Sequence, residues 1–400
     1  MELTKTSMTT RAKLWTKDFI IITLTAFLIF LTFYLLMTTM TLYAIEQFNA
    51  SETTAGLAAS IFVIGSLVAR LFAGKYIDVV GRRNLLYASL ILFLISSISY
   101  FFVTDFAFLL TIRFIHGIAF GVVTTVMGTA VMSIIPPTRR GEGTSYFSLS
   151  TPLATAIGPF IGILITQQAD FKWIFVTCTT FAIFNIIVML FAKIPEEPLT
   201  MEQRKELEGF RLQDFFEKSA LPIASIIFIL GITYASVLSY LSPFAIEVKL
   251  TGAASVFFIV YAVFLLGSRP LTGKLLDRRG ENIIIYPALI LFTIGLFCLS
   301  QSYGNAMLLI ASALIALGFG NMISCSQVAV VNLAPHHRIG LATSTFYIAM
   351  DAGIGVGPII IGAILPHVGY RGMYEVMALL VFITIFMYYF LHGRKAKKVV

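Results

Sequence analysis

Long apolar segments alternate with short polar ones along the whole 400-residue chain. Twelve of them are long enough to cross the roughly 30 Å hydrocarbon layer of a membrane as helices. Each runs apolar for about twenty residues or more, whereas the strands of a membrane barrel alternate over about ten residues. The predicted helical spans lie near 19–46, 53–75, 85–104, 107–134, 146–166 and 171–192, and then 221–246, 252–275, 282–302, 305–333, 340–365 and 369–392.

The composition supports this interpretation, since 58% of the residues are hydrophobic, only 12% are charged and 36 are Phe. Soluble domains do not reach such values. The first apolar segment follows Lys5, Arg11, Lys13 and Lys17, as a signal peptide would. It is too long for a cleavable signal and shows no small-residue cleavage site, so we expect a retained span. The predicted class is an all-α, multi-pass membrane protein.

One polar block occurs twice. The segment Arg70-Leu-Phe-Ala-Gly74-Lys75-Tyr-Ile-Asp78-Val-Val-Gly81 returns as Arg269-Pro-Leu-Thr-Gly273-Lys274-Leu-Leu-Asp277-Arg-Arg-Gly280, with Arg, Gly, Lys, Asp and Gly matched at an offset of 199. The pairs Gly158-Pro159 and Gly357-Pro358 keep the same offset. The chain is therefore a duplication, an architecture typical of transporters.

Six spans in each copy give both halves the same orientation, so the repeat is parallel about an axis along the membrane normal. We predict an N-terminal six-helix bundle over 1–192 and a C-terminal six-helix bundle with a basic tail over 221–400. Between them, apolar residues recur near helical spacing among mixed charges over 193–220, which predicts a cytoplasmic amphipathic linker.

Basic residues fall mainly on one side of the predicted topology. Of the 28 Lys and Arg residues, 22 lie on the side of the termini, three lie in loops on the other side and three lie within spans. This distribution places both termini in the cytoplasm. Topology and anionic lipid account for the net charge of +8 without a nucleic-acid partner. We expect a monomer in the plasma membrane whose partners are the lipid bilayer and a small-molecule substrate.

The first copy of the repeated block, Gly74 to Arg83, resembles the loop between spans two and three of the major facilitator superfamily, Gly-x-x-x-Asp-Arg-x-Gly-Arg-Arg, with Val79 in place of the first basic residue. The second copy has Glu281 and Asn282 where two basic residues are expected. The resemblance covers the whole chain and implies the major facilitator fold, with this loop as a cytoplasmic gate. The residues of the gate motif are Gly74, Asp78, Gly81, Arg82, Arg83, Gly273, Asp277, Arg278 and Gly280.

Elementary electrostatics agrees with a latch at this loop. Glycine permits the tight turn, and a carboxylate at a membrane boundary seeks a basic neighbour or the N-terminal end of a facing helix. Because the first copy keeps its basic pair, we expect the first half to carry the stronger latch. The alternative is that these charges only mark topology.

Three ionisable residues within spans are candidates for proton coupling. Arg113-Phe-Ile-His116-Gly117-Ile-Ala-Phe-Gly121 resembles the family's fourth-span motif, Arg-x-x-Gln-Gly-x-x-x-Gly, with His116 in place of Gln. Asp351 is the acidic residue well inside a span, where burial opposes its charge and makes protonation available as a switch. The alternatives are that Arg113 and His116 only pack and that Asp351 is a structural partner of Arg113 or Arg269.

The fifth span carries small residues at regular spacing. Ala154, Gly158, Pro159 and Gly162 resemble the antiporter motif Gly-x8-Gly-x3-Gly-Pro-x2-Gly-Gly, with Ser145 and Ala154 in place of the first two glycines and Ile163 in place of the last. Small residues allow close helix packing and Pro introduces a kink, so the pattern predicts a tight, bendable seam. It favours proton-driven export over the alternative of an ordinary packing face.

The resemblance implies a substrate cavity between spans one, four, seven and ten. The polar and aromatic side chains of these spans suit amphipathic or weakly cationic organic molecules. Besides Arg113 and His116, the candidates are Tyr34, Thr38, Thr39, Tyr234, Ser239, Tyr240, Asn321, Ser324 and Gln327.

Enzymatic function is not expected, because the chain has no phosphate-binding loop, no nucleophile elbow and no His-Glu-x-x-His motif. The three Cys residues lack metal-ligand spacing, and no cofactor is expected besides a proton gradient as energy source. The favoured function is proton-coupled export of drugs or small metabolites by alternating access. The alternatives are a symporter that imports a sugar or another nutrient and a non-transporting receptor or lipid-handling protein.

Overall fold

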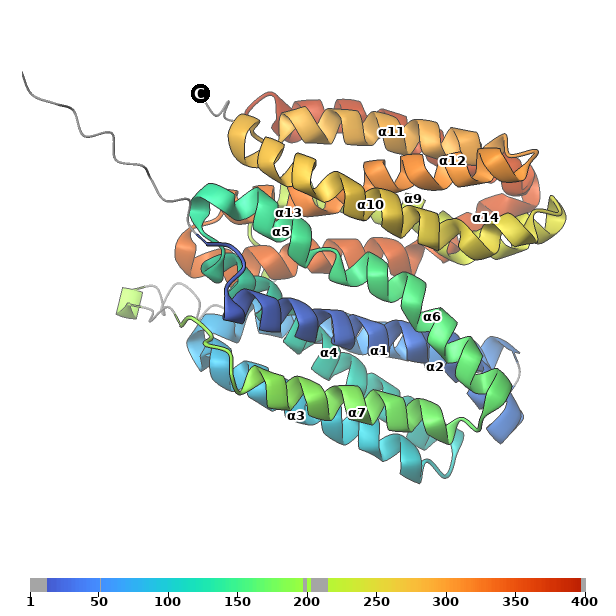
Figure 1. Cartoon of the computed structure of the whole chain (residues 1–400), viewed down its shortest axis with the longest axis horizontal. Helices are drawn as coiled ribbons and strands as arrows, with labels where there is room; N and C mark the ends of the chain where they lie inside the picture. Colours follow the sequence, from blue (N-terminus) through green and yellow to red (C-terminus); the bar gives the residue numbers. More distant parts are fainter. Residues whose placement is uncertain (1–12, 51, 197–199, 203–214, 397–400) are drawn as a thin grey trace, which may run out of the picture.

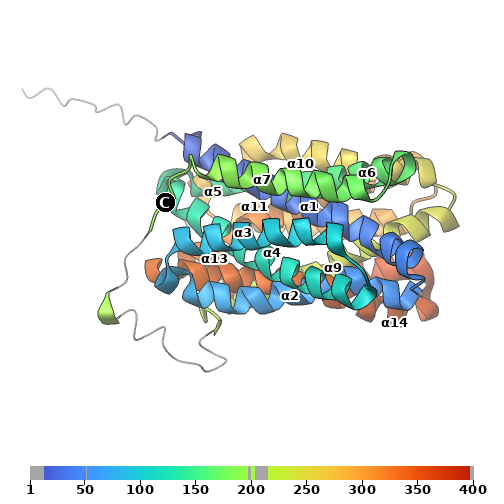
Figure 2. The same cartoon turned by 90° about the horizontal axis from the view of Figure 1, so that it is seen from below.

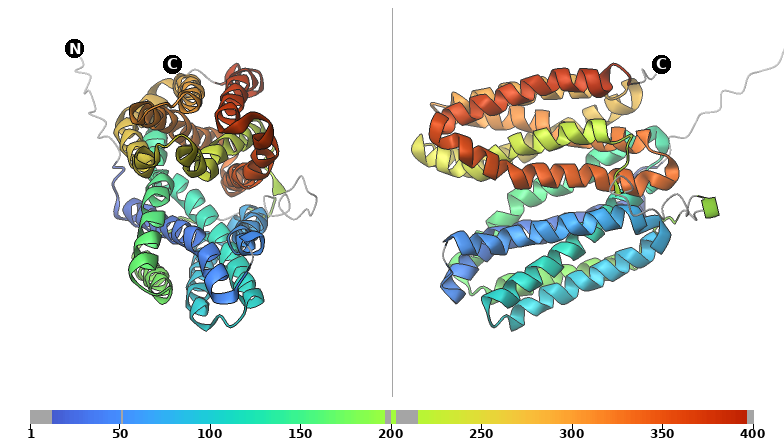
Figure 3. Two further views of the ribbon diagram at one scale, coloured as in Figure 1. Left: turned by 90° about the vertical axis from the view of Figure 1, so that its right-hand side faces the viewer. Right: turned by 180° about the vertical axis from the view of Figure 1, so that it is seen from behind.

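The computed structural model describes residues 13–50, 52–196, 200–202 and 215–396. These residues form two helical bundles that lie side by side, one from each half of the chain (Figures 1 and 3). The first bundle contains α1 (Lys17–Phe48), α2 (Glu52–Val80), α3 (Arg82–Ser99), η1 (Tyr100–Phe102), α4 (Phe106–Ile134), η2 (Pro137–Arg139), α5 (Arg140–Phe147), α6 (Ser150–Gln168) and α7 (Lys172–Met189).

The second bundle follows a similar order, with some differences in how its helices are divided. Its tenth span contains a π-helical turn, η4, and its last two spans form one long element whose helical path breaks at Gly369, where φ is 67°. Its elements are α9 (Leu221–Glu247), α10 (Thr251–Arg279), α11 (Asn282–Ser300), α12 (Asn305–Ile315), η4 (Ala316–Gly320), α13 (Asn321–Leu333), η5 (His336–Arg338), α14 (Ile339–Tyr388) and η6 (Tyr389–Gly393).

The predicted all-α membrane fold is confirmed. Among the described residues, 12 helices are long and apolar enough to cross a membrane. Both ends of the described chain lie at the same end of the molecule, which we call the terminus end (Figure 2). The predicted amphipathic helix of the linker falls largely on 203–214, outside the described residues.

Local chemistry sets the ends of several helices. Thr16 caps α1 by accepting a hydrogen bond from the Phe19 amide at 3.3 Å. The turns after α2 and α10 place Gly81 and Gly280 at φ values of 96° and 78°. These two matched glycines of the repeated block therefore occupy conformations that side chains disfavour, as the sequence predicts.

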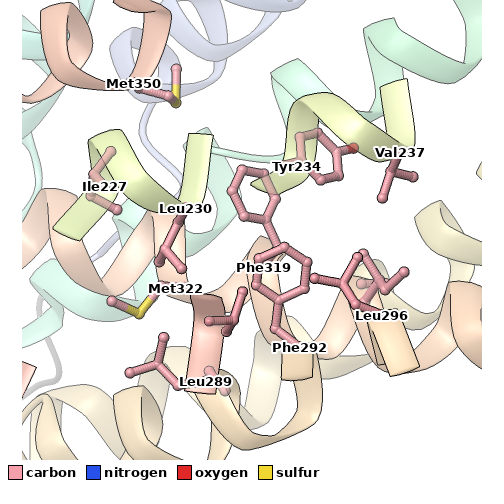
Figure 4. Packing of buried hydrophobic residues seen from close by; sticks show 14 of the residues in the cluster. Ile227, Leu230, Tyr234, Val237, Leu289, Phe292, Leu296, Phe319, Met322 and Met350 are labelled. Atoms are coloured by element: carbon pink, nitrogen blue, oxygen red, sulfur yellow. The ribbon is translucent and has the colours of Figure 1, made fainter. Parts of the chain in front are cut away.

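Small residues bring helices into backbone contact within each bundle. A Cβ atom added to Gly117 in α4 would lie 2.0 Å from the Phe62 carbonyl oxygen in α2. In the second bundle the Tyr234 ring stacks on the Phe319 ring at 3.9 Å, and the Phe292 ring packs against the Phe319 ring at 5.4 Å (Figure 4). Each half thus has its own apolar core, and polar contacts between the halves stand out against it.

Candidate functional site

An ion pair joins the two halves near the middle of their helices. The Arg70 Nε atom in α2 lies 2.9 Å from the Asp351 Oδ2 atom in α14, and Ser66 donates a hydrogen bond to the same oxygen at 3.4 Å. The Arg70 side chain is 1% exposed and the Asp351 side chain 16%. Burial of such charges is costly unless they are paired, and this pair forms only when α2 and α14 are in contact.

Aromatic and hydroxyl groups surround the pair. The Arg70 guanidinium lies 4.8 Å from the centre of the Tyr347 ring and 5.7 Å from that of Phe120. Ser344 in α14 donates a hydrogen bond to the Arg70 carbonyl oxygen, and the Asp351 carboxylate interacts electrostatically with the Tyr34 hydroxyl. Four helices therefore contribute to one compact site between the halves.

The structure corrects the expected partner of Asp351. Neither Arg113 nor Arg269 pairs with it, because both arginines lie within their own bundles. Sequence reasoning placed Arg70 within a span and at the head of the repeated block but did not connect it to Asp351. Their meeting across the two halves is a tertiary feature that the sequence pattern does not contain.

Arg113 and His116 lie in the core of the first bundle. Arg113 donates a hydrogen bond from Nε to the Ala58 carbonyl oxygen at 2.6 Å, and its guanidinium lies 4.6 Å from the centre of the Phe62 ring. The His116 Nδ1 atom is 3.1 Å from the Tyr100 hydroxyl. These contacts fit the packing alternative, and a role in proton coupling stays a prediction.

The candidates on span ten do gather at the interior. The Asn321 Oδ1 atom accepts hydrogen bonds from Ser268, Arg269 and Thr272. The Ser324 hydroxyl accepts one from Arg269 at 2.6 Å. Gln327 accepts one from Ser148 of the first half at 3.4 Å and donates one to the Tyr347 hydroxyl at 3.3 Å.

The candidates on spans one and seven are less uniform. Thr38 and Thr39 donate hydrogen bonds to the Leu35 carbonyl oxygen within their own helix, and Ser239 is exposed. Tyr240 donates to the Pro358 carbonyl oxygen at 2.9 Å. Tyr234 is buried against Phe319 and Thr39 is also buried, whereas Tyr34 is half-buried.

The two copies of the gate motif lie at the interface of the halves near the terminus end. Asp277 accepts hydrogen bonds from the amides of Gly141 at 2.5 Å and Glu142 at 3.1 Å, where α5 begins in the opposite half. A carboxylate at a helix N-terminus is the arrangement expected from the helix dipole. Asp78 forms an ion pair with Arg82 at 2.7 Å.

Other residues of the motif complete the contact. Gly74 packs so closely that an added Cβ would lie 2.1 Å from the Ser344 Cβ atom, and an added Cβ on Gly273 would lie 2.6 Å from the Glu142 Cα atom. The Arg83 amide donates to Glu196 at 3.3 Å, whereas Arg278 is exposed. Both copies contact the opposite half, so the relative strength of the two latches stays a prediction.

The residues that depart from the motif in the second copy bind the segment from Tyr388 to Gly393. Asn282 donates a hydrogen bond to the Gly393 carbonyl oxygen at 2.8 Å and accepts one from the Tyr388 hydroxyl at 2.6 Å. Glu281 forms an ion pair with His392. The changed residues thus have a structural task of their own.

The small residues of the fifth span form the expected tight seam. A Cβ added to Gly158 in α6 would lie 2.8 Å from the Tyr34 Cβ atom in α1, and one added to Gly162 would lie 2.9 Å from the Thr39 Cγ2 atom. Ala154 is fully buried and Pro159 lies inside α6. In the second half an added Cβ on Gly357 would lie 2.5 Å from the Ala235 Cβ atom, so the seam is duplicated.

Comparison with known proteins places the fold in context. The family model of the Major Facilitator Superfamily matches residues 22–303 and 286–400. An uncharacterized MFS-type transporter of Methanocaldococcus jannaschii is 25% identical over 91% of this chain and 95% of its own length. The multidrug resistance protein MdtL of Citrobacter koseri is 26% identical over 76% of this chain and 78% of its own length.

Two solved structures share the fold. The human organic anion transporter MFSD10 superimposes with a TM-score of 0.75 at 15% identity, covering 93% of this chain and 98% of that one. The proton:xylose symporter XylE superimposes with a TM-score of 0.73 at 14% identity, covering 93% of this chain and 94% of that one.

Proposed function

Because this chain belongs to the Major Facilitator Superfamily, whose members are transporters and not enzymes, we propose that it is a proton-coupled exporter of small amphipathic organic compounds. The similarity to MdtL supports a role in efflux. The observation that carries the proposal is the ion pair between Arg70 and Asp351, a titratable contact between the two halves.

In this proposal the transporter lies in the plasma membrane, and its terminus end faces the cytoplasm. Support comes from the Lys and Arg residues, 22 of 28 of which belong to the segments at that end. The gate motif then forms a cytoplasmic gate. The chain acts as a monomer, because each bundle carries its own core and the site lies between two halves of one chain.

The cytoplasmic gate is closed in this arrangement. Asp277 accepts a hydrogen bond there from the Gly141 amide of the opposite half. Arg140 donates one to Asn332 at 2.8 Å, and Gly74 packs on Ser344. The ion pair lies farther along the same interface. Opening toward the cytoplasm therefore requires that both the latch and the ion pair separate.

Protonation of Asp351 supplies the switch. A proton from the outer side neutralises the carboxylate, removes its attraction for Arg70 and so makes separation of α2 and α14 less costly. The halves then rock about the midplane, the proton leaves to the cytoplasm and the substrate enters. Return of the charge on Asp351 restores the pair and closes the cytoplasmic gate behind the substrate.

The proposed substrate site lies along the same interior surface, on Tyr34, Tyr234, Asn321, Ser324 and Gln327. Transport of a compound panel into inverted membrane vesicles tests the function. Uptake that appears only with an imposed proton gradient is the expected result. Gradient-independent uptake, or gradient-driven movement in the opposite direction, would contradict it.

A further inference from the structure

Arg269 in α10 is a buried cation whose described contacts are to neutral groups. Its side chain is 1% exposed, and it donates hydrogen bonds to the Ser324 hydroxyl at 2.6 Å, the Asn321 side-chain oxygen at 3.4 Å and the Gly320 carbonyl oxygen at 3.3 Å. Its Nε atom has no hydrogen-bond partner among the described residues. Because an unpaired guanidinium within a membrane span is costly, this arrangement calls for a negative charge from elsewhere.

The duplication shows where that charge is missing. In the first copy, Gly74 packs on Ser344; one turn earlier along α2 stands Arg70, and two turns later along α14 stands Asp351. An offset of 199 carries Arg70 onto Arg269 and Ser344 onto Ser145. The two arginines are therefore equivalent positions of one ancestral bundle.

The same steps can be followed in the second copy. An added Cβ on Gly273 would lie 3.2 Å from the Ser145 hydroxyl oxygen. One turn earlier along α10 stands Arg269, and seven residues after Ser145, beyond the end of α5, stands Pro152 in α6. Pro152 thus occupies the place of Asp351 and offers no carboxylate. Pro152 is half-buried, whereas Arg269 is 1% exposed.

The surroundings of Arg269 suit a polar head and an apolar body. The π-helical turn η4 ends at Gly320, beside the guanidinium, and such turns are frequent at functional sites. Phe319 of that turn stacks on Tyr234 at 3.9 Å (Figure 4). The planar fork of Arg matches a carboxylate in two parallel hydrogen bonds, whereas a cationic ligand would be repelled.

We propose that Arg269 binds the anionic group of the transported compound and that the substrates are small amphipathic organic anions. This assignment rests on the proposed export function and narrows its substrate class. The bound carboxylate takes the place that Asp351 occupies in front of Arg70. The ligand therefore neutralises the second arginine as the side chain of Asp351 neutralises the first.

A matched series of compounds tests the charge preference. Radiolabelled 4-phenylbutyrate, 4-phenylbutyramide and 4-phenylbutylamine share one body and carry a negative, zero and positive charge. In proteoliposomes with an imposed proton gradient, the parent protein is expected to move the anion at least about ten-fold faster than the other two, a discrimination typical of a paired charge. Equal behaviour of the three compounds, or preference for the amine, overturns the assignment.

Variants of the two facing positions locate the effect. Arg269→Gln is expected to lower anion transport at least about ten-fold, while Arg269→Lys keeps the charge and part of the preference. Pro152→Asp supplies the missing carboxylate and is expected to abolish anion transport, whereas Pro152→Ala does not. Anion transport by Arg269→Gln at the parent rate overturns the proposal. Gradient-driven transport selective for the amine would leave the proposed export function standing and remove only this assignment.

Discussion

Asp277 and Gly141, which lie 136 positions apart, are joined at 2.5 Å where the second copy of the gate motif meets the first half. The aspartate receives two backbone amides of a helix N-terminus. Asp277 contacts the opposite half through backbone amides of α5. A side-chain replacement in α5 would therefore leave this contact in place. Opening at the terminus end must therefore release Asp277 itself.

Replacement of Asp277 by Ala is expected to favour the state that is open at the terminus end, because it removes both amide contacts. A Cys introduced at the buried Ser145 should then react faster with a maleimide supplied on the side of the terminus end. Arg278→Ala is the matched control, since this neighbouring side chain is exposed. Equal labelling in both variants would exclude Asp277 as a latch.

Asp351→Asn is expected to abolish export driven by a proton gradient, since the neutral side chain cannot titrate. Breaking a buried pair by removing one partner costs about 3–5 kcal/mol, so this variant should also unfold at lower temperature than the parent. Arg70→Gln should lose stability for the same reason. Parental efflux by Asp351→Asn in vesicles with an imposed pH gradient would disprove the coupling role.

The double variant Arg70→Gln with Asp351→Asn separates stability from coupling. Both charges are gone, so much of the thermal stability lost in the single variants should return, whereas gradient-driven export should not. Thermal unfolding of the four proteins in one detergent gives the interaction energy of the pair. Additive losses in the double variant would show that the two charges do not interact.

Gly117→Ala is expected to destabilise the first bundle, because the new methyl group would lie 2.0 Å from the Phe62 carbonyl oxygen. Overpacking of this kind typically costs about 1–3 kcal/mol. Gly267→Ala serves as control, since an added Cβ there has no neighbour within 4 Å and Ala favours helix. A melting temperature of Gly117→Ala at or above that of Gly267→Ala would contradict the close contact of α2 and α4.

The carboxylate of Glu217, outside the membrane spans, links the segment before α9 to Arg338 in η5. Burial raises its pKa, but hydrogen bonds from Ser219 and Arg338 outweigh burial and leave the pKa below its usual value. A lowered pKa means that the contact stabilises the fold above the unfolded-state pKa and that this stability is lost as the pH falls through the folded-state pKa.

We therefore expect Glu217→Gln to melt at a lower temperature than the parent at pH 7. The difference should begin to shrink near about pH 4, where Glu is ordinarily protonated, and should disappear only below the lowered folded-state pKa. Melting curves of the two proteins from pH 3 to 8 measure this. A difference that grows on acidification would show that the sign of the linkage is wrong.

The fold could be predicted from the sequence because each span carries its own hydrophobic signal. Continuous apolar runs identify helices one at a time, and the offset between Arg70 and Arg269 reveals the duplication without any tertiary information. The turn glycines could be predicted equally well, because the positive φ of Gly81 and Gly280 is a local requirement. The break of the last long helix at Gly369 coincides with the predicted start of the span 369–392.

The site was only partly accessible. Asp351 was found because a carboxylate is rare within a span, but its partner depends on which helices of opposite halves meet, and periodicity does not encode that choice. Arg113 stood out for the same reason, yet the structure places it beside Ala58 and Phe62 within one bundle. Rarity of a charge identifies a residue of interest without identifying its neighbours.

The contacts of Glu281 and Asn282 with η6 have a practical consequence. His392 and Gly393 are held against the loop between α10 and α11, so a fluorescent protein fused directly after Gly393 would crowd the loop that carries the second copy of the gate motif. A purification tag attached there through a long flexible spacer leaves this contact intact. Reporter fusions that omit the spacer would report on a protein in which this loop is disturbed.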